Sequence, residues 1–97
     1  MIVNVFHDTT RVCQIIIPED IADDIDDVLG YAYRWTQNIN DSWSIKNDKF
    51  HDNNDHVVNV APLVDGYGHR SSMVGDRFEI VGGKTYVCAP IGFDEVA

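Results

Sequence analysis

The chain has 97 residues and a formal net charge of −9, from 16 acidic and 7 basic residues. This charge argues against direct binding to nucleic acid, because neutralising phosphates requires Lys and Arg, and against docking on anionic membranes. With 44% hydrophobic residues the sequence is too apolar for a disordered chain. We therefore expect a single domain spanning residues 1–97, with one modest core.

The compartment is predicted from what the sequence lacks. No apolar stretch approaches the length of a transmembrane helix, and the first residues, MIVN, do not have the basic start of a signal peptide. We expect a cytoplasmic protein. The two cysteines, Cys13 and Cys88, are not in CxxC spacing, so buried free thiols are expected rather than a redox centre or a disulfide.

Two β-rich runs open the chain. Residues 2–6 (IVNVF) and 12–17 (VCQIII) flank the polar stretch HDTTR, which is typical of a turn. This pattern predicts an antiparallel hairpin over residues 2–17. Pro18 then ends the second strand and suits the first turn of a helix, where a missing N–H is no loss.

An amphipathic helix is predicted over residues 19–36. Its apolar residues recur at helical spacing, namely Ile21, Ile25, Val28, Leu29, Ala32 and Trp35. Gly30 interrupts this pattern at a cost of about 1 kcal/mol relative to Ala. The acidic residues lie away from the apolar stripe, so the predicted helix has an acidic outer face.

The acidic run at the start of this helix is the most unusual feature of the sequence. It comprises six carboxylates with no Lys or Arg among them: Glu19, Asp20, Asp23, Asp24, Asp26 and Asp27. In a helix, Asp20/Asp24 and Asp23/Asp27 would be like-charge i,i+4 pairs, each costing about 0.2–0.5 kcal/mol. Glu19 and Asp20 offset the helix dipole. The other acids are then either tolerated for solubility or have a partner.

A long polar loop is predicted over residues 37–56, which are rich in Asn, Asp and Ser. In a small domain such a loop is functional, mobile or held by its own anchors. Trp43 and Phe50 are the expected anchors. Trp43, together with Trp35, is also a candidate exposed aromatic for binding a partner.

The last third has the clearest β pattern. A strand is predicted at 57–61, ended by Pro62, and a hairpin over 76–89 turns at Gly82-Gly83. A two-residue loop there pairs Ile80 with Thr85 and Phe78 with Val87. This register predicts that Phe78, Ile80 and Val87 belong to the core.

Several segments resemble one group of small proteins. They are Thr36-Gln37-Asn38-Ile39 with Ser42-Trp43, the stretch HRSSMVGD at residues 69–76, and Tyr86-Val87 with the closing Gly92-Phe93. Together these resemble small accessory proteins of actinobacteria and their bacteriophages. Met73 stands where that group commonly has Ser. The resemblance implies a phage or mobile-element accessory protein, and no activity, cofactor or catalytic residue comes with it.

Signatures of chemistry are weak. The four histidines lack the close Cys/His spacing of a zinc site, and the carboxylates and amides at positions 48 and 52–55 lack the Gly and Glu of an EF-hand. Arg70 either forms an anion pocket with His69, Ser71 and Ser72 or pairs with an acid. Neither a G-x-S-x-G motif nor a P-loop occurs. We expect no metal, no cofactor and no enzymatic activity.

Two functions remain open. The first is a small acidic interaction protein, phage-encoded, that binds and modulates a host protein through Asp20, Asp23, Asp24, Asp27 and Trp43. The second is a DNA mimic that inhibits a host nuclease, restriction enzyme or nucleoid protein. On a continuous helix the acids would lie about 2 Å apart along the axis, close to the roughly 1.7 Å per charge of duplex DNA.

The predicted fold class is α+β. One amphipathic helix packs on a small antiparallel sheet or a partly closed barrel, built from the hairpins at 2–17 and 76–89 and the strand at 57–61. The sequence leaves open whether the chain forms a homodimer.

Overall fold

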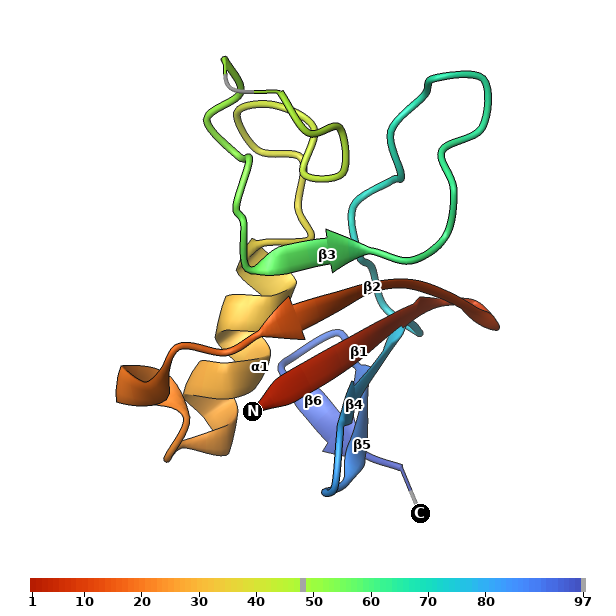
Figure 1. Ribbon diagram of the computed structural model, residues 1–97. Coiled ribbons are helices and arrows are strands. Elements are labelled where there is room, and N and C mark those ends of the chain that lie inside the picture. Colours follow the sequence, from red (N-terminus) through yellow and green to blue (C-terminus); the bar gives the residue numbers. More distant parts are fainter. Residues whose placement is uncertain (48, 97) are drawn as a thin grey trace.

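The computed structural model describes residues 1–47 and 49–96. Its elements are β1 (Ile2–His7), β2 (Thr10–Ile16), a 3-10 helix η1 (Glu19–Ile21), α1 (Ile25–Arg34), β3 (Val57–Asn59), β4 (Arg77–Ile80), β5 (Thr85–Cys88) and β6 (Phe93–Glu95). The strands form one antiparallel sheet in the order β3-β2-β1-β4-β5-β6, and α1 packs on one face of it (Figure 1). The expected α+β arrangement of one helix on an antiparallel sheet is confirmed. None of the helices described is long and apolar enough to cross a bilayer.

The sheet is open, with β3 and β6 as its edges, so the barrel alternative is wrong. It is also larger than predicted, because β6 forms a sixth strand. Two of the three residues of β6 are Asp94 and Glu95, which have low β-propensity and hide the strand in the sequence. A short, charged edge strand of this kind discourages pairing with other chains.

The N-terminal hairpin forms as predicted, with one irregularity. Val5 pairs with Cys13 but Phe6 pairs with Arg11, which makes Val12 an extra residue on β2. This bulge brings both Val12 and Cys13 into the core, although they are adjacent. The turn that joins the strands places Asp8 in the left-handed region, at a φ of 56°.

The β4–β5 hairpin differs from the predicted register by one residue. Ile80 N–H donates to Lys84 O, and Phe78 pairs with Tyr86 rather than Val87. The loop therefore has three residues: Gly83 N–H closes a turn onto Ile80 O, and Gly82 takes the positive φ, 80°, that such a turn needs. Phe78 and Ile80 are buried as predicted. Val87 lies opposite Arg77 on the other face, so its assignment to the core is wrong.

The single helix predicted over 19–36 is two helices. The 3-10 helix η1 ends at Ile21, and α1 starts only at Ile25. Asp24 between them is extended, and its carboxylate accepts hydrogen bonds from the N–H groups of Asp26 and Asp27, at 2.8 and 3.3 Å. The chain breaks here because Asp satisfies these donors as an N-cap better than as an interior residue.

The core lies between α1 and the inner face of the sheet. The helix contributes Val28, Leu29 and Ala32, and the sheet and loops contribute Val3, Val5, Val12, Cys13, Ile15, Ile17, Trp43, Val57, Phe78, Ile80 and Cys88. Both cysteines are free and buried, as expected. Ile25, although on the predicted apolar stripe, is 39% exposed, because α1 has only just begun there.

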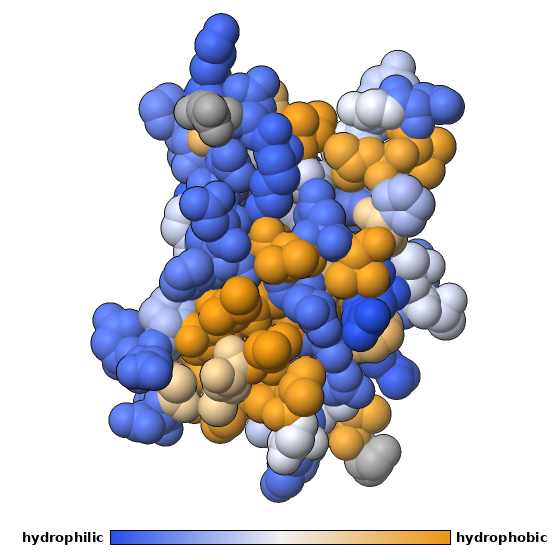
Figure 2. Space-filling view, viewed as in Figure 1, coloured by the Kyte–Doolittle hydropathy of each residue, from blue (hydrophilic) through white to orange (hydrophobic). Residues whose placement is uncertain are grey.

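The outer face of the sheet is not covered by a helix and faces the viewer in Figure 1. Figure 2 shows apolar side chains gathered on this side around the start of β1, with hydrophilic residues beside them. The cross-strand pair Ile2 and Ile16 lies in this region, and Val81 donates its N–H to Ile2 O. All three side chains are partly exposed.

Candidate functional site

The acidic run lies at the surface, at the end of the molecule where α1 begins. All six carboxylate residues of segment 19–27 are exposed. Asp24 caps α1, while Asp26 and Asp27 lie in its first turn, where they offset the helix dipole. Asp20/Asp24 and Asp23/Asp27 are not i,i+4 pairs of one helix, so the repulsion predicted for them does not arise in that form. The estimate of about 2 Å per charge also required a continuous helix and does not hold.

Among the residues that the structure describes, no cationic side chain lies within 4.0 Å of the carboxylates of this segment. Over residues 1–47 and 49–96, the ion pairs within 4.0 Å involve the acids Asp8, Asp52, Asp76 and Glu95 and not those of segment 19–27. Asp24 has a local role as the N-cap of α1, and Asp26 and Asp27 offset the dipole of its first turn. Asp20 and Asp23 have no hydrogen bond to their carboxylates in the described part of the chain.

Trp43 is not a surface residue. Its side chain is completely buried, its indole N–H donates to Arg70 O at 2.9 Å, and its ring stacks on His69 with 5.7 Å between centroids. The prediction that Trp43 anchors the polar loop is confirmed. A partner cannot reach this indole in the folded chain, so we do not include Trp43 in a docking surface.

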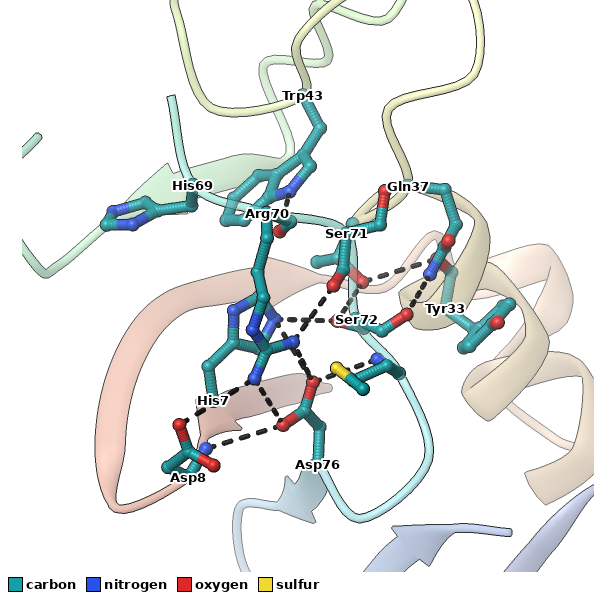
Figure 3. A network of polar contacts seen from close by, with 12 residues as sticks. His7, Asp8, Tyr33, Gln37, Trp43, His69, Arg70, Ser71, Ser72 and Asp76 are labelled. Atoms are coloured by element: carbon teal, nitrogen blue, oxygen red, sulfur yellow. Dashed lines mark hydrogen bonds and ion pairs between the residues drawn. The ribbon is translucent and has the colours of Figure 1, made fainter. Parts of the chain in front are cut away.

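A buried polar network lies beside Trp43, between β1, the end of α1 and the segment before β4 (Figure 3). His7 Nε2 is 2.9 Å from Ser72 Oγ, and Ser72 Oγ donates to Thr36 Oγ1 at 2.8 Å. Thr36 in turn donates to Ala32 O at 2.8 Å. His7, Thr36 and Ser72 are all buried. No sequence motif predicted this network.

The direction of each hydrogen bond in this network determines whether Ser72 can act as a nucleophile. The single hydroxyl proton of Ser72 points to Thr36, so Ser72 must accept from His7, whose Nε2 therefore carries a proton. Ser72 thus has no base to take its proton, unlike the nucleophile of a Ser-His-Asp triad. Asp76 Oδ2 also lies on the Nε2 side of the ring, at 3.7 Å, whereas a triad places the carboxylate at Nδ1.

Asp76 ties the network to the surface. Arg70 holds it through two bonds, Nη1 to Oδ2 at 2.6 Å and Nη2 to Oδ1 at 2.9 Å, and the N–H groups of Met73 and Asp8 also donate to it. Burial acts to raise the pKa of Asp76, but Arg70 and the Met73 N–H hold this pKa below its usual value. Of the two alternatives for Arg70, the pairing with an acid is the one observed.

His7 is neutral in this setting. Burial lowers its pKa from the ordinary 6.5, and the nearby Asp76 carboxylate, which acts to raise it, does not compensate. A signal for this network was present in the sequence. Val3, Val5 and His7 alternate along β1, and Asp76, Phe78 and Ile80 alternate into β4, so both polar residues fall on the inner face.

Asp52 organises the polar loop. It is buried, and its Oδ2 accepts from the N–H groups of Ile39, Asn40 and Asp41 at 2.6–3.1 Å, while Arg34 Nη2 donates to Oδ1 at 2.8 Å. Burial acts to raise the pKa of Asp52, but the Asp41 N–H and Arg34 hold it well below its ordinary value. Its oxygens are therefore used by the protein itself rather than offered to a cation.

A metal site does not form in the part of the chain the structure describes: no three His, Cys, Asp or Glu residues there lie close enough together. Asp48, a candidate calcium ligand in the sequence, lies outside the described residues.

Two surface pockets lie on opposite sides of the β4–β5 hairpin. One, of about 470 Å³, has polar and apolar surface in nearly equal parts and lies on the outer face of the sheet; it is lined by Phe6, Asp8, Thr9, Gly75, Arg77, Glu79 and Thr85. The other, of about 410 Å³, is mostly apolar and lies next to the acidic segment; it is lined by Met1, Ile25, Ile80, Val81, Gly82, Gly83, Lys84 and Tyr86.

Comparison with protein-family models, with curated proteins and with solved structures finds no match to this chain.

Proposed function

We propose that this chain is a small, non-enzymatic interaction protein that binds a basic surface of another protein through acidic segment 19–27. One observation carries the proposal: six exposed carboxylates gather at one end of the domain without a cationic side chain within 4.0 Å among the described residues. Charges arranged in this way speed encounter with an oppositely charged partner and exclude like-charged ones.

The buried network supports a non-enzymatic role. His7 and Ser72 lie within hydrogen-bond reach, as a catalytic pair would, but the hydroxyl proton of Ser72 is committed to Thr36. The network links β1, α1 and the segment before β4 by hydrogen bonds. Its role is therefore to stabilise the packing of these three segments. From the resemblance to accessory proteins of actinobacteria and their phages, we propose that the partner is a host protein in the host cytosol.

The DNA-mimic alternative has less support from the structure than it had from the sequence. It rested on charges repeating along one helix axis, and segment 19–27 is a 3-10 helix, an extended residue and the first turn of α1. We therefore propose a protein surface of basic side chains as the partner, without requiring that it bind DNA.

The test compares two variants of equal charge. One carries Asp20→Asn, Asp23→Asn and Asp27→Asn; the control carries Asp55→Asn, Asp65→Asn and Asp94→Asn, three exposed acids elsewhere. Each set removes three charges, from −9 to −6. Asp24 is kept because it caps α1.

Wild type and both variants are used to capture proteins from host lysate, and the association rate of the main captured protein is measured at several salt concentrations. We expect the first variant to associate about tenfold more slowly at low salt and the control to behave like wild type, because nearby charges dominate steering. Equal rates for both variants would remove segment 19–27 from the interface.

A further inference from the structure

The apolar groove beside the acidic segment lies between the first turn of α1 and the β4–β5 turn. Met1, Ile25 and Val81 form its walls and are 49%, 39% and 52% exposed, and Ile80, 5% exposed, closes its floor. Its volume, about 410 Å³, falls within the range of pockets that hold small ligands or side chains. Ile2 and Ile16 continue the apolar surface along the sheet.

The groove exists because α1 begins later in the chain than the spacing of the apolar residues predicts. Ile25 has the spacing of a core residue, but the break at Asp24 places it at the first position of α1, over the rim of the sheet. Gly82 and Gly83 carry no side chains that would fill the space from the other side. An apolar surface of this kind with polar surroundings is typical of an interaction site.

The charges around the groove limit what can occupy it. Ile25 stands between Asp24 and Asp26, and the rest of segment 19–27 extends the negative charge on that side. On the opposite side, Lys84 forms an ion pair with Glu95, with Nζ and Oε1 2.8 Å apart. A second copy of this chain would bring two acidic rims together, which opposes self-association through this face.

We propose that the groove binds one large aliphatic side chain of a partner segment in which that side chain is flanked by Lys or Arg. The aliphatic group enters between Ile25 and Val81, and the flanking cations face segment 19–27. This inference rests on the proposed function and adds the apolar anchor, since exposed charges by themselves contribute little affinity.

The probe is a blocked pentapeptide with one leucine between two pairs of lysines, titrated into the ¹⁵N-labelled protein and followed by NMR at low salt. A matched peptide has glutamine in place of leucine, and a second has glutamates in place of the lysines. We expect the leucine–lysine peptide to shift the amide signals of Ile25, Gly82, Gly83 and Lys84 as well as those of segment 19–27. With the glutamine peptide, we expect the groove signals to stay in place and the affinity to be about tenfold lower, because no leucine side chain is transferred from water into the groove.

Two protein variants locate the contact. Val81→Thr, in the groove, weakens binding of the leucine–lysine peptide about three- to fivefold, the effect of replacing one buried methyl group by a hydroxyl. Val64→Thr is the matched control, at a valine that is 71% exposed and outside the groove, and leaves binding unchanged. The dispersion of the amide spectrum confirms that both variants are folded.

Other outcomes overturn the inference in distinguishable ways. If both lysine peptides bind equally and shift only segment 19–27, the acidic contact of the proposed function stands but the groove is not a site. If the glutamate-flanked peptide binds as well as the lysine one, the partner need not be basic. If no peptide binds, both proposals fail. If raising the protein concentration alone shifts the groove signals and sedimentation shows a dimer, the occupant is a second copy.

Discussion

His7 and Asp76 lie opposite each other on the inner face of the sheet, two residues along the strands from Val5 and Phe78, with Nε2 and Oδ2 3.7 Å apart. The apolar rows of β1 and β4 thus end in a polar pair. Ser72, Thr36 and Arg70 complete its hydrogen bonds, so the end of the core is closed by polar groups that satisfy one another.

Asp76→Asn is expected to destabilise the fold. The substitution keeps the shape of the side chain but removes the charge that Arg70 and two backbone N–H groups bind. We expect the free energy of unfolding to fall by about 2 kcal/mol, less than for a fully buried ion pair, because Arg70 is 39% exposed. Urea denaturation measures it. Asp8→Asn is the control: this side chain is 92% exposed and 3.9 Å from Arg70, and its loss should change stability by under about 0.5 kcal/mol.

Acidification is expected to lower stability in two stages. The pKa of His7 is lowered from 6.5 in the folded state, so the unfolded chain binds this proton more readily, and the stability present above pH 6.5 is lost as the pH falls below it. The pKa values of Asp52 and Asp76 are also lowered, from 3.8, so their contribution is lost below about pH 4. Urea denaturation between pH 7.5 and 3 measures both stages. In His7→Asn the upper stage should disappear; its persistence would assign that stage to another group.

Asp24→Ala is expected to cost about 1 kcal/mol of unfolding free energy, because the N–H groups of Asp26 and Asp27 lose their acceptor. Asp24→Asn should retain most of the stability, since Asn caps helices nearly as well. Asp23→Ala, one residue earlier and exposed, serves as the control and should be nearly neutral. Thermal or urea unfolding compares the three. A loss in Asp23→Ala as large as in Asp24→Ala would contradict the capping role.

Cys13 and Cys88 are expected to resist thiol reagents in the folded protein. Both are buried, and burial raises the pKa of Cys13 to about 12 and also raises that of Cys88, so few thiolates exist at neutral pH. Reaction with a disulfide reagent at pH 7.5 should be slow without urea and rapid, with two thiols per chain, in urea. Fast reaction of either thiol in the native protein would place it at the surface instead.

The local pattern of the sequence was enough to predict most of the elements. Alternating apolar residues identify β1, β2, β4 and β5, and the spacing of Val28, Leu29 and Ala32 identifies the buried side of α1. Buried free thiols and the anchoring of the polar loop by Trp43 also follow from residue type. These features are predictable because each depends on neighbours within a few residues.

Other features depend on competition between neighbours that a periodic pattern does not weigh. In the sequence, Asp24 is compatible with both a helix interior and an N-cap. The helix breaks there because the Asp24 carboxylate accepts hydrogen bonds from the N–H groups of Asp26 and Asp27. The β4–β5 register similarly depends on Gly82 taking a positive φ, which shifts Val87 out of the core. A one-residue change in a strand exchanges its faces.

The sequence by itself determined an acidic α+β fold with an exposed run of carboxylates, because charge, periodicity and residue type are local properties. Only the tertiary structure decided which side chains meet. The alignment of β1 with β4 places His7 opposite Asp76, and the short α1 leaves Ile25 facing Val81 beside the acids. The two residues of each pair are more than 50 positions apart in the sequence, so their arrangement depends on how the sheet and the helix pack rather than on any local pattern.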